Sequence, residues 1–159
     1  MTVRRKFFLI LTLVWMVMIF SFSSRSGDIS AQDSGYVGMV IGEVFVPDFE
    51  QWSEAKQNDF ADAIDHPIRK TAHAMEYAVL GFFIAGIFTD QKKLRKWRIL
   101  LPWVIGAAYA ATDEFHQLFV PGRSGQISDV ILDSAGVALG VLVMIGLEKI
   151  YHGKDSAQR

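Results

Sequence analysis

The chain has 159 residues, of which 51% are hydrophobic and 21% are charged, and its formal net charge is −1. This length is that of a single domain covering residues 1–159, and the near-neutral charge gives no reason to expect nucleic acid as a partner. Because the chain has no cysteine, disulfides, thiolate metal sites and cysteine nucleophiles are excluded.

The first element is an apolar stretch without charge, residues 7–22, which follows three basic residues at positions 4–6. With the two serines after it, the stretch would be about 27 Å long as a helix, enough to cross the hydrocarbon core. A basic start, an apolar centre and small residues at its end are also typical of a secretory signal peptide. Because the run is long and contains bulky residues such as Trp15, we interpret residues 7–24 as a retained membrane anchor.

Residues 25–66 form the only long hydrophilic segment, and acidic residues outnumber basic ones in it. Apolar residues recur at helical spacing from Tyr36 to Phe45 and again within residues 49–64, with Pro47 between the two pieces. We expect short amphipathic helices here, which lie on the membrane surface or cap the helix bundle.

Three further apolar runs follow. Pro67 suits the first turn of a helix, because its missing N–H needs no partner there, and a second span is predicted at about residues 68–88. The third span covers about residues 99–119 and ends before a Pro-Gly turn. Ser128 is a plausible N-cap for a fourth span at about residues 129–151. The sequence therefore predicts an all-α membrane protein with four transmembrane helices.

The distribution of basic residues predicts the orientation. Four spans place both termini on one side of the membrane, together with the basic segment at residues 90–98. Of the 16 Lys and Arg residues, 11 fall on this side. Because positive residues concentrate in cytoplasmic segments, we expect cytoplasmic termini, an extracytoplasmic segment at residues 25–66 and a multi-pass location in the cell membrane.

Polar residues gather near the outer ends of the last three predicted spans, at similar depth and on single helix faces. Ionisable residues inside a membrane are expensive, so they indicate a functional site by default. The candidate site residues are Arg69, Lys70, His73, Glu76, Tyr77, Asp113, Glu114, His116, Gln117, Arg123, Asp129 and Asp133.

Two functions fit this set. Three cations and two helix N-termini at the outer boundary favour an anion, for which a lipid phosphate or a lipid-linked cell-wall precursor is the expected ligand. The alternative is an enzyme, a hydrolase or transferase acting on such a lipid. In that case Glu76 or Asp113 would be the general base, and His73 or His116 its acid–base partner. The remaining residues of the set would bind the ligand.

Other interpretations stay open. The acids, bases and histidines could form a purely structural network, for which Asp133 is the strongest candidate. The pairs His73–Glu76 and Asp113–His116 have a spacing that metal sites use, but no further ligand spacing supports one, so no metal or other cofactor is predicted. A transporter is disfavoured, because the cytoplasmic halves of the spans lack polar residues. The glycines at 136 and 140 indicate close helix packing.

Four motifs resemble those of the VanZ-like family of bacterial membrane proteins. In chain order they are Trp15-x-x-x-Ile-Phe-x-Phe-Ser-Ser24, Ile68-Arg-Lys-x-x-His-x-x-Glu-Tyr-x-x-Leu-Gly81, Asp113-Glu-x-His-Gln-x-x-x-Pro-Gly-Arg123 and Asp129-x-x-x-Asp133-x-x-Gly136. The resemblance implies a multi-span protein of the cell envelope with a link to glycopeptide (teicoplanin) resistance. It implies no catalytic mechanism.

Overall fold

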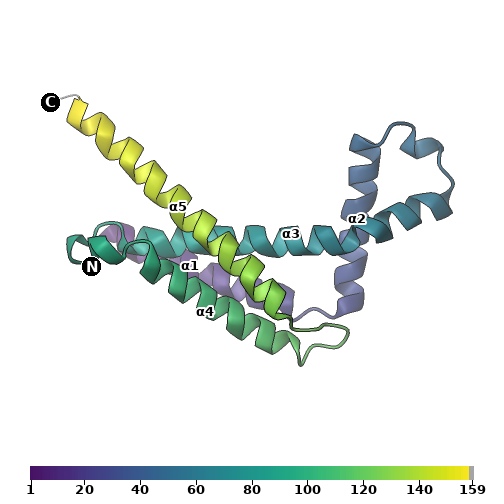
Figure 1. Ribbon diagram of the computed structural model, residues 1–159, viewed down its shortest axis with the longest axis horizontal. Helices are drawn as coiled ribbons and strands as arrows, with labels where there is room; N and C mark the ends of the chain where they lie inside the picture. The colour runs from purple at the N-terminus through teal and green to yellow at the C-terminus, as the bar shows by residue number, and fades with distance from the viewer. Residues whose placement is uncertain (158–159) are drawn as a thin grey trace.

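The computed structural model describes residues 1–157, and the side chains of residues 92, 93, 95 and 152–157 lie outside this description. The described part is all-helical and contains no strand, which confirms the predicted class. Figure 1 shows its five α-helices. They are α1 (Val3–Ser23), α2 (Gly27–Phe45), α3 (Glu54–Phe88), α4 (Leu100–Gln117) and α5 (Ile127–Ala157), with two short 3₁₀ segments, η1 (Phe49–Gln51) and η2 (Lys92–Trp97).

Three helices of the described part are long and apolar enough to cross a membrane. They are α1, α3 and, within α5, the segment Ile127–Tyr151. The helix at the predicted third span, α4, is not among them, because residues 113–117 at its end carry four polar side chains. A fourth membrane crossing therefore stays a prediction.

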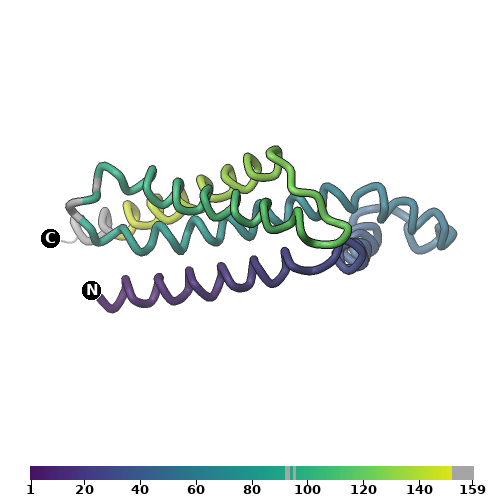
Figure 2. The backbone as a smooth tube through the Cα atoms, turned by 90° about the horizontal axis from the view of Figure 1, so that it is seen from below, coloured from purple at the N-terminus to yellow at the C-terminus, as the bar shows by residue number. Residues whose placement is uncertain are grey.

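The long helices form a bundle. Figures 1 and 2 show α1, α3 and α4 running alongside one another, with α5 crossing α3 and α2 standing across the far end of α3. At one end, the Arg4 guanidinium lies 3.1 Å from both Asp90 Oδ1 and Glu148 Oε1. At the other end, the Gly27 N–H donates to the Pro121 carbonyl at 3.0 Å. The start of α1, the Asp90 turn before η2 and the C-terminal part of α5 therefore share one end, and α2 shares the other with the α4–α5 loop.

Small residues bring α3 and α5 into backbone contact. A Cβ atom added at Gly136 would lie 2.3 Å from the Ala74 carbonyl oxygen, and one added at Gly140 would lie 1.8 Å from that of Ala78. Only glycine fits at such distances, so the predicted packing role of these two glycines is confirmed. The core around the crossing contains Tyr77, Leu80, Ile84, Val137, Val141 and Met144.

The prediction that Pro67 opens a new helix is wrong. α3 begins at Glu54, after the capping residue Ser53, and continues through Pro67. Proline removes one helical hydrogen bond, but α2 packs along the segment before it, where Ala61 contacts Gly38. With 35 residues α3 is about 52 Å long, which exceeds the hydrocarbon thickness of about 30 Å.

The buried side of α2 consists of small residues. Its buried residues are Gly27, Ser30, Ser34, Gly38 and Gly42. By contrast, Tyr36 and Phe45 on the predicted apolar face are 73% and 76% exposed. A helix thus forms within residues 25–66 as expected, but its apolar face points away from α3. The second expected helix is divided between η1 and the start of α3.

We expect Gly140→Ala to destabilise the protein, because the new methyl group would meet the Ala78 carbonyl oxygen. Overpacking of this kind costs about 1–3 kcal/mol. The matched control is Gly146→Ala on the same helix, where a Cβ atom has nothing within 4 Å. Thermal unfolding in detergent should give a lower midpoint for the first variant only. Equal midpoints for both variants would contradict the close contact of α3 with α5.

Candidate functional site

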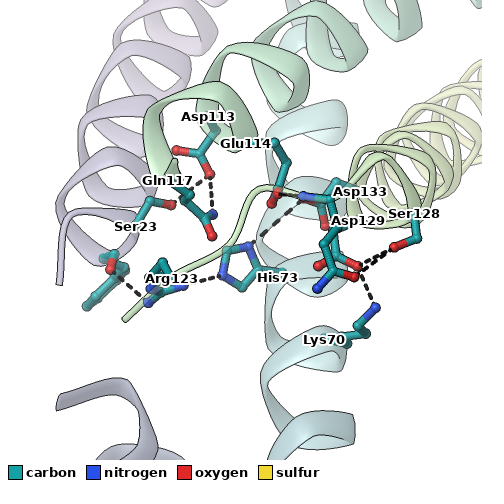
Figure 3. A network of polar contacts seen from close by, with 12 residues as sticks. Ser23, Lys70, His73, Asp113, Glu114, Gln117, Arg123, Ser128, Asp129 and Asp133 are labelled. Carbon is teal, nitrogen blue, oxygen red and sulfur yellow. Dashed lines mark hydrogen bonds and ion pairs between the residues drawn. The ribbon is translucent and has the colours of Figure 1, made fainter. Parts of the chain in front are cut away.

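A polar cavity lies at the α2 end of the bundle, between α3, α4, α5 and the α4–α5 loop (Figure 3). Its volume is about 160 Å³, enough for a small head group or several water molecules. The residues that line it are His66, Arg69, Lys70, His73, Glu114, Gln117, Gly122, Arg123, Ser124, Gln126, Asp129, Leu132 and Asp133.

A second cavity lies beside it, between α1, α2 and α3, and includes more apolar side chains. Phe22 and Val37 belong to its wall. Arg69, His73 and Arg123 line both cavities. These three residues therefore form a shared boundary between a polar space and a more apolar one.

Two of the three predicted phosphate-binding cations are already paired with aspartates. Arg69 Nη2 lies 2.5 Å from Asp65 Oδ2, one helical turn earlier on α3. Lys70 Nζ lies 2.5 Å from Asp129 Oδ1, which belongs to the first turn of α5. An anion in the polar cavity would have to compete with these carboxylates for both cations.

Arg123 joins the α4–α5 loop to α1 and α2. Its Nε donates to the Arg25 carbonyl at 3.1 Å, and its Nη2 donates to the Phe22 carbonyl at 3.4 Å and to Ser30 Oγ. Gly122 before it has φ +72°, a left-handed conformation that glycine adopts without strain. Burial and, secondly, the positive charge of Arg69 lower the pKa of Arg123 from its ordinary value, although the guanidinium stays charged.

Three buried carboxylates keep oxygens that have no hydrogen-bond partner. Asp113 Oδ2 accepts from Ser23 Oγ at 2.7 Å and from Gln117 Nε2 at 3.3 Å, but Oδ1 has no partner. Glu76 Oε2 and both carboxylate oxygens of Asp133 are likewise buried and have no hydrogen-bond partner. Buried polar groups are nearly always paired. A structural network in which bases satisfy all the acids is therefore incomplete.

His73 faces Asp133 where α3 meets α5 (Figure 3). Its Nδ1 lies 4.0 Å from Asp133 Oδ2, and its Nε2 lies 3.5 Å from Arg123 Nη1. Glu114, whose Oε2 accepts the Gln126 main-chain N–H at 2.9 Å, completes a group of three. One possible ligand atom from each of His73, Glu114 and Asp133 lies within 4.8 Å of the others. This group differs from the i, i+3 pairs considered from the sequence.

Most of the predicted site residues line the polar cavity. They are Arg69, Lys70, His73, Glu114, Gln117, Arg123, Asp129 and Asp133. Glu76 lines the second cavity. Asp113, Tyr77 and His116 line neither of the two. Tyr77 is fully buried in the core, and His116 packs on the Phe20 ring with centroids 4.6 Å apart.

Sequence reasoning missed two side chains that hold site residues. Asp65 lies four residues before Arg69, a spacing that predicts an ion pair on a helix. It was missed because the helix was expected to begin at Pro67. Ser23, at the end of the first predicted span, donates to Asp113. No local signal could reveal this contact, because the two residues are distant in sequence.

The prediction that Ser128 is the N-cap of the last helix is wrong. α5 begins at Ile127, and the Gln126 carbonyl accepts the N–H groups of Asp129 and Val130. The Gln126 N–H is held in turn by Glu114. A tertiary contact therefore fixes where this helix starts.

The comparisons with known proteins assign the family. A family model described as VanZ/LLP1 matches residues 8–148, which include every residue lining either cavity. The chain belongs to the VanZ/LLP1 family. The resemblance seen in the motifs is thereby confirmed. Searches of the curated proteins and of the solved structures found no match.

We expect Ser23→Ala to destabilise this VanZ/LLP1 protein, because it removes the hydroxyl that donates to the buried Asp113 carboxylate. Loss of a hydrogen bond to a charged group costs about 1.5–3 kcal/mol. The control is Ser21→Ala, which removes an exposed hydroxyl bonded to Val17 of its own helix. Thermal unfolding in detergent should separate the two. A Ser23→Ala midpoint equal to that of Ser21→Ala would show that the buried bond contributes nothing.

Proposed function

We propose that this VanZ/LLP1 member is a multi-pass protein of the bacterial cell membrane that crosses the bilayer four times. The 18 residues of α4 make a helix of about 27 Å, long enough for the fourth crossing. Both termini are then cytoplasmic, and residues 25–66 are outside. The ion pairs that join Arg4 to Asp90 and Glu148 at one end of the bundle support an even number of crossings, whereas the choice of side rests on the basic residues. Of the cations that predict it, Lys92, Lys93, Arg95 and Lys154 have side chains outside the described part, and Arg159 lies wholly outside it.

A reporter that is active only outside the cytoplasm tests the orientation. Fused within residues 51–58, it should be active, because that segment is predicted to be extracytoplasmic. Fused within residues 92–96, it should be inactive, because the basic loop is predicted to stay in the cytoplasm. The reverse pattern would overturn the orientation and move the polar cavity to the inner leaflet.

We propose further that the paired cavities bind the phosphate head group and adjoining apolar portion of an anionic lipid or a lipid-linked cell-wall precursor in the outer leaflet. The observation that carries this proposal is the shared boundary of Arg69, His73 and Arg123 between the two cavities. An amphipathic ligand needs this arrangement: cations and donors for its head group beside an apolar wall. Binding of a cell-wall precursor would also account for the link between VanZ-like proteins and teicoplanin resistance.

Lipid binding should depend on charge at this boundary. Purified protein in nanodiscs should retain phosphatidylglycerol over phosphatidylcholine, and Arg123→Gln should weaken that retention by roughly tenfold to a hundredfold, because it removes a charged donor. Arg98→Gln, which removes a cation near η2 at the opposite end, is the control.

Native mass spectrometry measures the bound lipid, and a thermal midpoint for each variant shows whether it is folded. Because Arg123 also ties the loop to α1, Lys70→Gln serves as a second variant. Equal retention of the two lipids by the unmodified protein would refute the proposal. So would unchanged retention in both folded cavity variants.

The alternative is a membrane enzyme, a hydrolase or transferase acting on the same lipid phosphate. It is favoured by Glu76, whose Oε2 is buried without a partner in a cavity that also contains His73 and Arg123. A general base, an acid–base partner and a cation for the phosphate are then in one place. Release of phosphate or of a head group from the bound lipid, lost in Glu76→Gln while the lipid still binds, would favour the enzyme.

A further inference from the structure

We propose that His73, Glu114 and Asp133 bind one divalent transition-metal ion, Zn²⁺ or Mn²⁺. The three residues come from α3, α4 and α5, and one possible ligand atom from each lies within 4.8 Å of the others. The proposal goes beyond lipid binding, because the ion would occupy this position with or without a lipid in the cavity.

The environment of Asp133 is the observation that indicates a bound ligand. Its side chain is 1% exposed and lines the polar cavity, and neither of its carboxylate oxygens has a hydrogen-bond partner. Its ion-pair partner is His73, whose Nδ1 is 4.0 Å away, beyond hydrogen-bond distance. Burying a carboxylate without a partner costs several kcal/mol, so a proton or a cation must neutralise it.

A cation fits the surroundings of Asp133 better than a proton does. Protonation would remove the charge, but it satisfies one carboxylate oxygen at most and leaves the other without a partner. A metal ion bonds directly to the carboxylate oxygens. It also bonds to the imidazole, which the proton would leave unused.

The charge balance of the cavity calls for a cation. Among the described lining residues, Arg69 and Lys70 are each paired with an aspartate. Arg123 is then the remaining guanidinium or ammonium group of the lining, which also contains two further carboxylates, Glu114 and Asp133. A divalent ion bound by Glu114 and Asp133 balances the negative charges of the two carboxylates.

The ligand types select the class of metal. Imidazole suits Zn²⁺ and other transition metals, whereas sites made only of oxygen suit Mg²⁺ and Ca²⁺. One imidazole with two carboxylates therefore favours Zn²⁺ or Mn²⁺. A tetrahedral ion with bonds of about 2.0 Å holds its ligand atoms about 3.3 Å apart, so ligand atoms that now lie within 4.8 Å of one another need to close by up to about 1.5 Å.

Arg123 opposes the metal ion. An ion on His73 Nδ1 places the ring proton on Nε2, which lies 3.5 Å from Arg123 Nη1. Two donors would then face each other, and the guanidinium has to turn away. Where the cavity holds a phosphate, an ion with three protein ligands offers the phosphate oxygen its fourth coordination position; this last point rests on the proposed function.

The full chain, purified in detergent without a histidine tag and stripped with a chelator, tests the site. Titration with Zn²⁺, Mn²⁺ and Mg²⁺, followed by calorimetry and elemental analysis, should show one Zn²⁺ or Mn²⁺ per chain and no binding of Mg²⁺ at the same concentration. Asp133→Asn and Glu114→Gln should each weaken binding about tenfold or more. Glu148→Gln, a carboxylate change elsewhere on α5, is the control and should bind as the unmodified protein does.

Stability separates a metal ligand from a structural charge pair. Asp133→Asn should raise the thermal midpoint of the stripped protein, because it removes an unpartnered buried charge, and should abolish the rise that metal gives. A structural pair with His73 predicts the opposite, a lower midpoint. Absence of stoichiometric metal, or normal binding by Asp133→Asn, would overturn the metal site.

Arg123→Gln distinguishes the metal site from the lipid site. It should weaken lipid retention but leave metal affinity unchanged or higher, because a positive charge beside the ion is lost. Metal binding without any lipid preference would refute the proposed function alone. Lipid preference that is unaffected by the chelator, with no metal bound, would refute the metal site alone.

Discussion

Backbone contact between α3 and α5 determines where the polar side chains meet. Gly136 lies against the Ala74 carbonyl, and these two residues are close in sequence to Asp133 and His73. Only glycine permits this approach, so the same feature that packs the helices also brings an imidazole opposite a buried carboxylate. The glycines are therefore part of the reason that the cavity has its shape, although none of the chemistry proposed for it involves them.

Charge in the cavity is unevenly distributed. Arg69 and Lys70 are paired with aspartates, and Arg123 is held by main-chain carbonyls and a serine. Glu76 and Asp133 nevertheless keep buried oxygens without partners. A protein built only to join its helices gains nothing from such groups, because unpaired buried charges destabilise it. This imbalance is the physical reason for considering a ligand, either a phosphate that frees the cations or a metal ion that binds the carboxylates.

α2 and the first half of α3 pack on each other at the end of the bundle that holds the cavity. The small-residue face of α2 packs on α3, and the Gly38–Ala61 contact supports the turns of α3 that precede Pro67. The continuous helix places Asp65 and Arg69 one turn apart, and Ser34 of α2 donates to the same aspartate. The hydrophilic segment is thus joined to the rim of the cavity through Asp65.

The sequence by itself determined the all-helical class, the approximate places of the apolar stretches and the family. These follow from local properties: runs of apolar residues, the spacing of small residues and motifs in order along the chain. It also selected Arg69, His73, Glu114 and Asp133, because ionisable residues are conspicuous beside apolar ones.

Tertiary structure decided the rest. α3 continues through Pro67 because the packing of α2 offsets the lost hydrogen bond. α5 begins at Ile127 because Glu114 accepts the main-chain N–H of the preceding residue, Gln126. Tertiary structure also decided which carboxylates are paired, because a partner such as Ser23 lies far away in sequence and is fixed only when the helices meet. Local patterns specify what each helix carries, whereas pairing depends on distances between helices, which no local pattern contains.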